Sequence, residues 1–164
     1  MNAQNVLVER LESSGLAERV EERNRLRGRA LKEGFEGLVL IEKGIAVPEG
    51  IEGLLARPEM DVVIAPCFQQ VVVEEPLSGS VVLVKRSRVP LAWSFAEDSK
   101  TVRVNLLSFN DLWPSRLMQA DMAALKCAFF SRNVLEKIEF HANPDNNVDE
   151  YFFFALDCRR FGFQ

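Results

Sequence analysis

Apolar residues early in the chain recur at the three- and four-residue spacing of an amphipathic helix. In the stretch "LAERVEERNRLRGRAL" the apolar residues that fall on one side are Leu16, Val20, Leu26, Ala30 and Leu31. The opposite side mixes acidic and basic residues, as a solvated helix face does. We therefore expect a helical N-terminal region over residues 1–33, helical from residue 5 and interrupted near Ser14 and Gly15.

Between residues 37 and 107 the pattern changes to short apolar runs rich in valine. The runs are "GLVLIEKGIAV", "DVVIAP", "FQQVVVEE", "SVVLVKRSRV" and "LAWSFAEDSKTVRVNLL". Proline, glycine, serine and charged pairs separate them, which is typical of β-strands joined by turns. "AEDSKT" predicts a hairpin loop, because Asp and Ser supply local turn hydrogen bonds. "PEGIEGLLARP" predicts one short helix between its two prolines.

The last third of the chain predicts one more helix and a final strand. Over residues 115–137 helical spacing gathers one wide apolar arc, made of Leu117, Met118, Met122, Ala124, Leu125, Ala128 and Phe129. The aromatic run "YFFFALDC" predicts a strand over residues 150–158. The order of helix, strands, helix and strand predicts a single α+β domain over residues 1–164. We expect its helices to pack on a mostly antiparallel sheet.

Composition and charge narrow the class of protein. The chain has 164 residues, of which 48% are apolar and 27% charged, and this suits a folded domain. Its net charge of −4 provides no general attraction to nucleic acid or to anionic membranes. The apolar runs are shorter than the roughly 20 residues of a membrane span, and we expect no secretory signal. Cys67, Cys127 and Cys158 lack a Cys-x-x-Cys spacing, so we expect reduced, mostly buried thiols in a cytoplasmic protein.

The most ligand-like segment is "NPDNNVDE", residues 143–150. Asp145, Asn147 and Asp149 match the start of a calcium-binding loop. Glu150 stands where that loop needs glycine, and Leu156 stands where it needs a bidentate glutamate. Asn, Pro and Asp are also common turn residues. We therefore expect a turn before the last strand and no metal.

Three residues are candidates for enzyme chemistry. Asp121 falls inside the apolar arc of the expected helix, where a carboxylate needs a partner or acquires a raised pKa. His141, the only histidine, is a possible general base oriented by Glu139, Asp149 or Glu150. Alternation in a strand places Ile138 and Phe140 inward and His141 on the Glu139 side. Cys158 precedes two arginines that lower a thiol pKa. No nucleophile, phosphate-loop, dinucleotide or zinc-protease signature accompanies them, so we expect no cofactor, and a structural role is favoured for each.

The first helix carries an unusual row of cations. Arg19, Arg23 and Arg27 recur every fourth residue within or beside the apolar side, near Leu16 and Val20. We call these three residues the arginine stripe. Arginines beside an apolar surface suit contact with an acidic protein or with phosphate, or else their stems cover the core while their heads reach water.

The leading functional hypothesis is a non-catalytic protein that binds another protein, such as an adaptor, an inhibitor, an immunity factor or a subunit of a small assembly. The partner is another protein or a second copy of the chain. The expected contact residues are Leu16, Arg19, Val20, Arg23, Arg27 and Phe153, since one residue of the Phe152–Phe154 run must face away from the other two in a strand. The first alternative is nucleic-acid binding through Arg19, Arg23, Arg25, Arg27 and Arg29, although this helix lacks aromatic residues for stacking on bases. An enzyme using Asp121 or His141 is the second alternative.

Overall fold

The computed structural model describes residues 5–13, 15–57, 59–76, 82–98, 101–107, 119–143, 145 and 148–163. The chain divides into two compact units. Unit 1 consists of Met1–Ala65 and Met122–Gln164, and unit 2 consists of Pro66–Asp121. The protein is a mixed α+β protein, as the sequence predicted.

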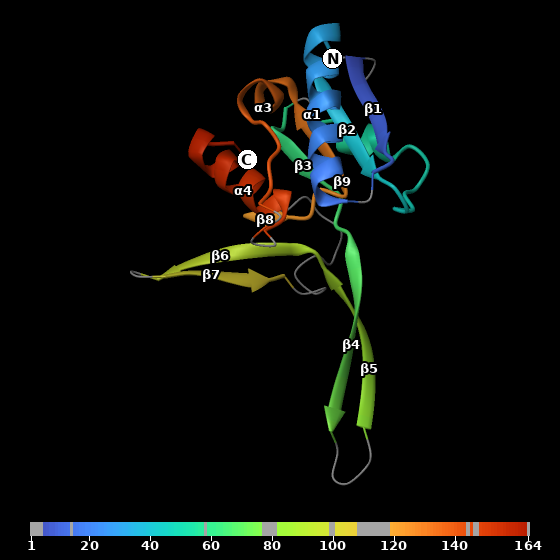
Figure 1. The fold of residues 1–164 in the computed structure, drawn as a ribbon, viewed down its shortest axis with the longest axis vertical. Coiled ribbons are helices and arrows are strands. Elements are labelled where there is room, and N and C mark those ends of the chain that lie inside the picture. The colour runs from blue at the N-terminus through green and yellow to red at the C-terminus, as the bar shows by residue number, and fades with distance from the viewer. Residues whose placement is uncertain are drawn as a thin grey trace. The chain divides into compact units, whose positions relative to one another are not determined.

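Unit 1 is built around a four-stranded mixed sheet (Figure 1). Its strands are β1 (Val6–Leu11), β2 (Gly37–Glu42), β3 (Val62–Ile64) and β9 (Cys127–Ser131), and β8 (Met122–Ala123) is a further short strand. The order across the sheet is β1-β2-β9-β3. β1 runs parallel to β2, whereas β9 is antiparallel to both of its neighbours. The helices are α1 (Leu16–Glu33), α2 (Ile51–Leu55), α3 (Arg132–Lys137) and α4 (Glu150–Phe161).

The ends of α1 are set by local chemistry. The backbone N–H of Gly15 lies 3.4 Å from a carboxylate oxygen of Glu18, which satisfies one of the free donors at the start of the helix. Gly34 ends the helix in the left-handed conformation at φ 80°, where a side chain is disfavoured. Between these ends, Leu26 and Ala30 are buried. The predicted helix is therefore confirmed from residue 16 onward.

One core cluster fills the space between the sheet and three of the helices. Its members are Leu7, Leu11, Leu26, Ala30, Leu38, Leu40, Leu125, Ala128, Phe130, Val134, Leu135, Ile138, Phe140 and Phe154. They come from β1, α1, β2, β9, α3 and α4, and from the segments around Leu125 and Phe140. Three phenylalanines pack at its centre, with the ring of Phe130 edge-on to those of Phe140 and Phe154. Such pairs hold α4 on the sheet by apolar burial and by ring geometry.

Unit 2 contains two antiparallel hairpins. β4 (Phe68–Pro76) pairs with β5 (Val82–Pro90) over nine residue pairs, from Phe68 opposite Pro90 to Pro76 opposite Val82. β6 (Ala92–Asp98) pairs with β7 (Thr101–Leu106) over six. Asp98 lies opposite Thr101, so the predicted hairpin in "AEDSKT" is confirmed. The short helix predicted in "PEGIEGLLARP" is likewise present as α2.

Three predicted elements were wrong. Residues 6–11 form β1 and not a helix, because Leu7 and Leu11 alternate with exposed positions along an edge strand. Residues 127–131, within the expected helix 115–137, form β9. All five are buried, the polar Ser131 included, so their burial follows no period. Residues 132–137 of the same range form the helix α3, and residues 115–118 lie outside the described residues. The expected strand 150–158 lies in α4, which begins after the N-cap Asp149 and ends before Gly162.

Among the described residues, no helix has the length and apolar character needed to cross a membrane.

Candidate functional site

The inner side of α1 holds a fully buried arginine. Arg23 lies on the same side as Leu26 and Ala30, three and seven residues further along the helix, and this places it against the sheet. Its Nη2 donates a hydrogen bond of 2.6 Å to Oε1 of Glu42 and another of 2.9 Å to the carbonyl of Leu125. The guanidinium also lies 5.8 Å from the centre of the Phe140 ring. Arg23 therefore joins α1, β2 and the segment before β9 inside the fold.

The start of α4 supplies the rest of this cluster. Oε1 of Glu150 lies 3.4 Å from Nη2 of Arg23 and 3.4 Å from Nε of Arg19. Arg19 also lies 3.6 Å from Asp149 and 3.7 Å from Glu42. We call Arg19, Arg23, Glu42, Asp149 and Glu150 the ion cluster. It connects three elements that are far apart in the chain.

Burial dominates the acid–base behaviour of Glu150. Removal from water raises the pKa of Glu150 to about 7, although Arg23 and Arg19 oppose the rise. Asp149 adds to the rise through its negative charge and a hydrogen bond. Burial lowers the pKa of Arg23, against the attraction of Glu150 and Glu42. Glu150 is thus the carboxyl group of the cluster that titrates near neutrality.

The ion cluster is incompletely hydrogen-bonded. Nε and Nη1 of Arg23 and Oε2 of Glu150 are buried and have no hydrogen-bond partner among the described residues. A buried polar atom without a partner lowers stability, and buried ion pairs contribute little net stability against apolar residues of the same size. We therefore expect the cluster to contribute more to how α1, β2 and α4 fit together than to net stability.

The remaining arginines of α1 also have carboxylate or carbonyl neighbours. Nε of Arg27 donates a hydrogen bond of 2.6 Å to the carbonyl of Leu135, and its Nη1 lies 3.7 Å from Glu139. Arg29 pairs with Glu9 on β1 and with Glu33 one turn along the helix. Arg25, with its side chain 65% exposed, lies 3.9 Å from Glu22. Leu16 and Val20 are half-buried, and Val20 packs against the core.

His141 follows a segment that α1 holds in place. Asn24 donates to the Phe140 carbonyl at 2.7 Å and accepts from its N–H at 2.9 Å. Ile138 and Phe140 are buried while His141 is exposed, which confirms the predicted alternation. Nδ1 of His141 lies 3.1 Å from the Glu139 carbonyl and 3.8 Å from a carboxylate oxygen of Asp157. The carboxylate close to His141 is therefore that of Asp157 on α4, which was not among the carboxylates expected from the sequence.

The other two enzyme candidates, Cys158 and Asp121, occupy different settings. Burial, and then the charges of Asp157 and Asp61, raise the pKa of Cys158 to about 12. Cys158 is half-buried, as the favoured structural role predicted, and the arginines that follow it do not bring its pKa down. The Cys158 thiol is therefore protonated at neutral pH. Asp121 is exposed and belongs to unit 2, where its N–H donates 3.1 Å to the carbonyl of Trp93. The apolar helix arc that made Asp121 notable is absent at that residue.

The calcium-like segment enters a helix. The backbone groups of Asn143 and Val148 exchange hydrogen bonds of 3.1 and 3.0 Å, which closes the predicted turn. Asp149 then accepts from the Glu150 N–H at 2.8 Å and caps α4. Asn147 lies outside the described residues. Within the described ranges, no group of three or more His, Cys, Asp or Glu residues is arranged to hold a metal ion.

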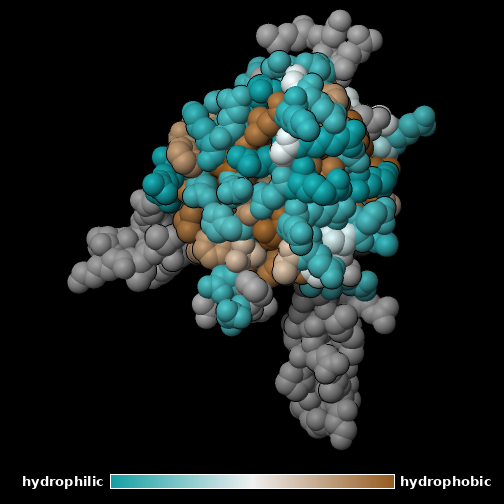
Figure 2. Space-filling model, turned by 45° about the horizontal axis from the view of Figure 1, so that its top comes forward, coloured by the Kyte–Doolittle hydropathy of each residue, from teal (hydrophilic) through white to brown (hydrophobic). Residues whose placement is uncertain are grey.

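Large apolar side chains are exposed at several places on the surface. They are Val8, Leu54, Phe68, Leu106, Leu156 and Phe161. Phe153, which the sequence analysis expected at an interface, is half-buried on α4, and its ring lies 4.8 Å from that of His141. On the face of the molecule drawn in Figure 2, apolar patches interrupt a mostly hydrophilic surface.

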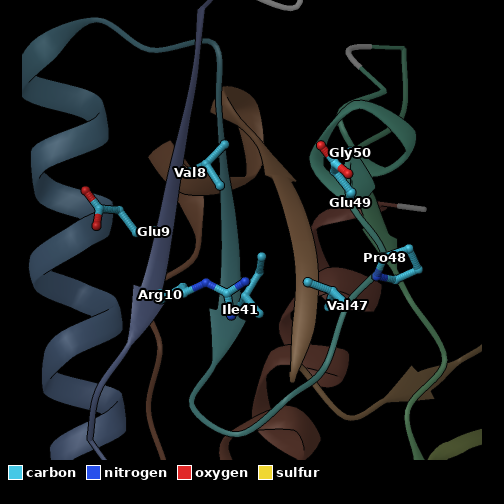
Figure 3. A pocket seen from close by; sticks show the side chains of 8 residues that line it. All are labelled: Val8, Glu9, Arg10, Ile41, Val47, Pro48, Glu49 and Gly50. Carbon is cyan, nitrogen blue, oxygen red and sulfur yellow. The ribbon is translucent and has the colours of Figure 1, made fainter.

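A hollow of about 470 Å³ lies beside the edge strand β1. Figure 3 shows Val8 and Arg10 of β1 turned toward Ile41 of β2, with Val47 and Pro48 across from them. Glu9 is turned the other way, toward α1. Glu49 and Gly50 complete the lining. The lining of the hollow therefore combines apolar side chains with one cation, Arg10, and two carboxylates, of which Glu9 is turned away.

The sequence contains no local signal for the residues that β2, α4 and the loop at Val47 and Pro48 contribute to the ion cluster and the hollow. Glu42 lies 19 residues from Arg23, and Glu150 lies 131 residues from Arg19. Neither separation follows a helix or strand period, so no local pattern marks these pairs. No sequence pattern predicts the hollow either, because Val47 and Pro48 lie in a loop, where side chains follow no helix or strand period.

No protein-family model matches the chain, and no curated protein or solved structure is significantly similar to it.

Proposed function

We propose that this is a non-catalytic protein-binding protein whose β4–β5 hairpin makes the contact with a protein partner. The observation that carries the proposal is the pairing of these strands. β4 and β5 pair with each other over nine residue pairs, and no third strand pairs with either in the part of the chain that the structure describes. Since no third strand among the described residues uses the outer edges of the hairpin, we infer that backbone groups there, apart from those of Phe68, are available to another chain.

The length and sequence of the hairpin support this assignment. A two-stranded sheet is marginally stable in water and gains stability from a further strand or a packed surface. β4 contains "VVV" at residues 71–73, and β5 begins with "VLV" at residues 82–84. The β-branched valines favour strand pairing. A partner that adds to this hairpin supplies both the missing backbone bonds and apolar cover.

The alternatives receive less support from the side chains expected to perform them. Arg23 is buried, and Arg19, Arg27 and Arg29 lie close to carboxylates of the same chain, which reduces the charge available to phosphate. For an enzyme, the two expected residues, Asp121 and His141, are both exposed and belong to different units.

Capture of partners from native lysate tests the proposal. The wild-type chain is compared with a double variant, Val72→Lys and Val84→Lys, which places one added charge within each strand of the hairpin. The matched control is Leu54→Lys with Leu156→Lys, two exposed apolar positions of unit 1. We expect the wild type and the control to capture the same partner protein, with or without nuclease. The hairpin variant should fail to capture it.

Thermal melting of each variant separates loss of contact from loss of the fold. Retention of every captured protein by a folded hairpin variant would contradict the proposal. If nuclease abolishes the capture, and if replacing Arg25 and Arg29 also reduces it, the result would favour nucleic-acid binding instead. Binding to purified duplex DNA would then lose about one unit of its log-salt slope per arginine removed.

A further inference from the structure

β1 is an edge of the four-stranded sheet. β2 pairs with one side of β1, and within the described ranges no strand pairs with the other side. Val8 is 43% exposed, and Arg10 is exposed as well. A strand edge of this kind is a template for an extended segment of another chain.

The side chains along this edge point to two different places. Glu9 is turned toward α1 (Figure 3). It forms an ion pair there with Arg29, so its charge is already matched within the chain. Val8 and Arg10, one residue to either side, both line the hollow. Residues two apart on a strand share a face, so an added strand would place two of its own side chains beside them.

The charge in the hollow defines what suits it. The guanidinium of Arg10 forms no ion pair or hydrogen bond with any described residue, unlike Arg29 and Arg23 of α1. Around it lie the apolar side chains of Val8, Ile41 and Val47. Two of the lining residues carry carboxylates, Glu9 and Glu49. A carboxylate beside Arg10 and an aliphatic side chain beside Val8 therefore complement this surface.

We propose that β1 and the adjoining hollow bind an extended segment of a protein partner as a fifth strand of the sheet. The segment carries an acidic residue opposite Arg10 and, two positions away, a valine or isoleucine opposite Val8. Backbone hydrogen bonds to β1 supply the general affinity, and the two side chains select the segment. This site belongs to unit 1 and is independent of the hairpin in unit 2.

A displayed library of random twelve-residue peptides, selected on the immobilised full-length chain, provides the probe. We expect the enriched peptides to contain an acidic residue two positions from a valine or isoleucine. One such peptide and its acid-to-lysine counterpart are then synthesised and titrated against wild type and variants. On binding of the acidic peptide, the backbone amides of residues 6–11 exchange with solvent more slowly.

Charge reversal gives the decisive comparison. Arg10→Glu weakens the acidic peptide at least tenfold and gains affinity for the lysine peptide, whereas the control Arg25→Glu, on the exposed side of α1, changes neither. Val8→Lys weakens both peptides. The hairpin variant Val72→Lys with Val84→Lys binds the acidic peptide as the wild type does. The proposal is overturned if no peptide is enriched, if Arg10→Glu and Val8→Lys bind as the wild type does, or if the β1 amides are not protected.

Discussion

Nη2 of Arg23 on α1 donates a 2.6 Å hydrogen bond to Oε1 of Glu42, the last residue of β2. The arginine is completely buried, and the glutamate is nearly so. The pair crosses from the helix to the sheet next to the start of α4, where Glu150 approaches the same guanidinium. Four predictions follow from the contacts of this region and of α4.

Removal of Glu42 alone leaves a buried guanidinium short of its nearest carboxylate. We expect Glu42→Ala to lower the free energy of unfolding by about 3–5 kcal/mol, the range for breaking a buried ion pair. The double variant Glu42→Ala with Arg23→Met should lose clearly less stability, because the guanidinium that Glu42→Ala leaves without its nearest carboxylate is then absent. Urea unfolding measures both. The control Glu12→Ala removes an exposed pair with Lys43 and should match the wild type. Equal losses in single and double variants would show that Glu42 acts through packing alone.

Stability should fall as pH rises through the titration of Glu150. The pKa of Glu150 in the folded protein is about 7, above its ordinary value of 4.5, so the folded state holds the proton more tightly. The contribution of Glu150 is complete below about pH 4.5 and is lost as pH rises through about 7.

The comparison with Glu150→Gln isolates this effect. Urea unfolding at several pH values between about 4.5 and 8 should show the wild type losing stability relative to the variant as pH rises. The lowered pKa of Glu22 changes stability at pH values below its ordinary value of 4.5. Glu22 is also the same in wild type and variant, so it does not alter the difference between them. A constant difference between wild type and variant across the range would mean that Glu150 titrates normally.

Asp149 should matter as the cap of α4. Asp149→Ala removes the acceptor for the Glu150 N–H and should lower the free energy of unfolding by about 1 kcal/mol. Asp149→Asn keeps the oxygen acceptor and should lose less, although it gives up the attraction to Arg19. Thermal and urea unfolding of the two variants test this order. If Asp149→Asn and Asp149→Ala lower the free energy of unfolding by the same amount, the charge of Asp149 is responsible and not its role as the cap.

Cys158 should be slow to react in the folded protein. Its pKa of about 12 leaves almost no thiolate near neutral pH, and the thiolate is the reactive form. Iodoacetamide labelling followed by peptide mass spectrometry should show much slower alkylation of Cys158 in the native state than in urea. Labelling of the native protein at the rate of the unfolded chain would contradict the burial of this thiol.

The sequence by itself determined the elements whose signals are local. The amphipathic spacing before Gly34 specifies α1, the turn residues of "AEDSKT" specify the β6–β7 hairpin, and two prolines bound α2. Each of these depends on contacts within a few residues or on the backbone limits of Gly and Pro. The mixed α+β class followed from them.

Tertiary structure decided the elements whose runs are mostly apolar and aromatic. "CAFFS" is β9 because β2 and β3 pair with it on both sides, and "YFFFALDC" lies in α4 because Asp149 caps the helix and Phe154 packs on Phe130. Such runs carry no period of 2 or 3.6 that distinguishes a strand from a helix.

The sites were also decided by tertiary structure. The arginines of α1 were visible in the sequence, but their partners Glu42 and Glu150 come from β2 and α4. The hollow arises where the edge strand β1 meets the loop that contains Pro48. Which charge is neutralised inside the fold and which stays available on an edge depends on the packing of elements distant in the chain, because a charge leaves water only where the fold brings a partner to it.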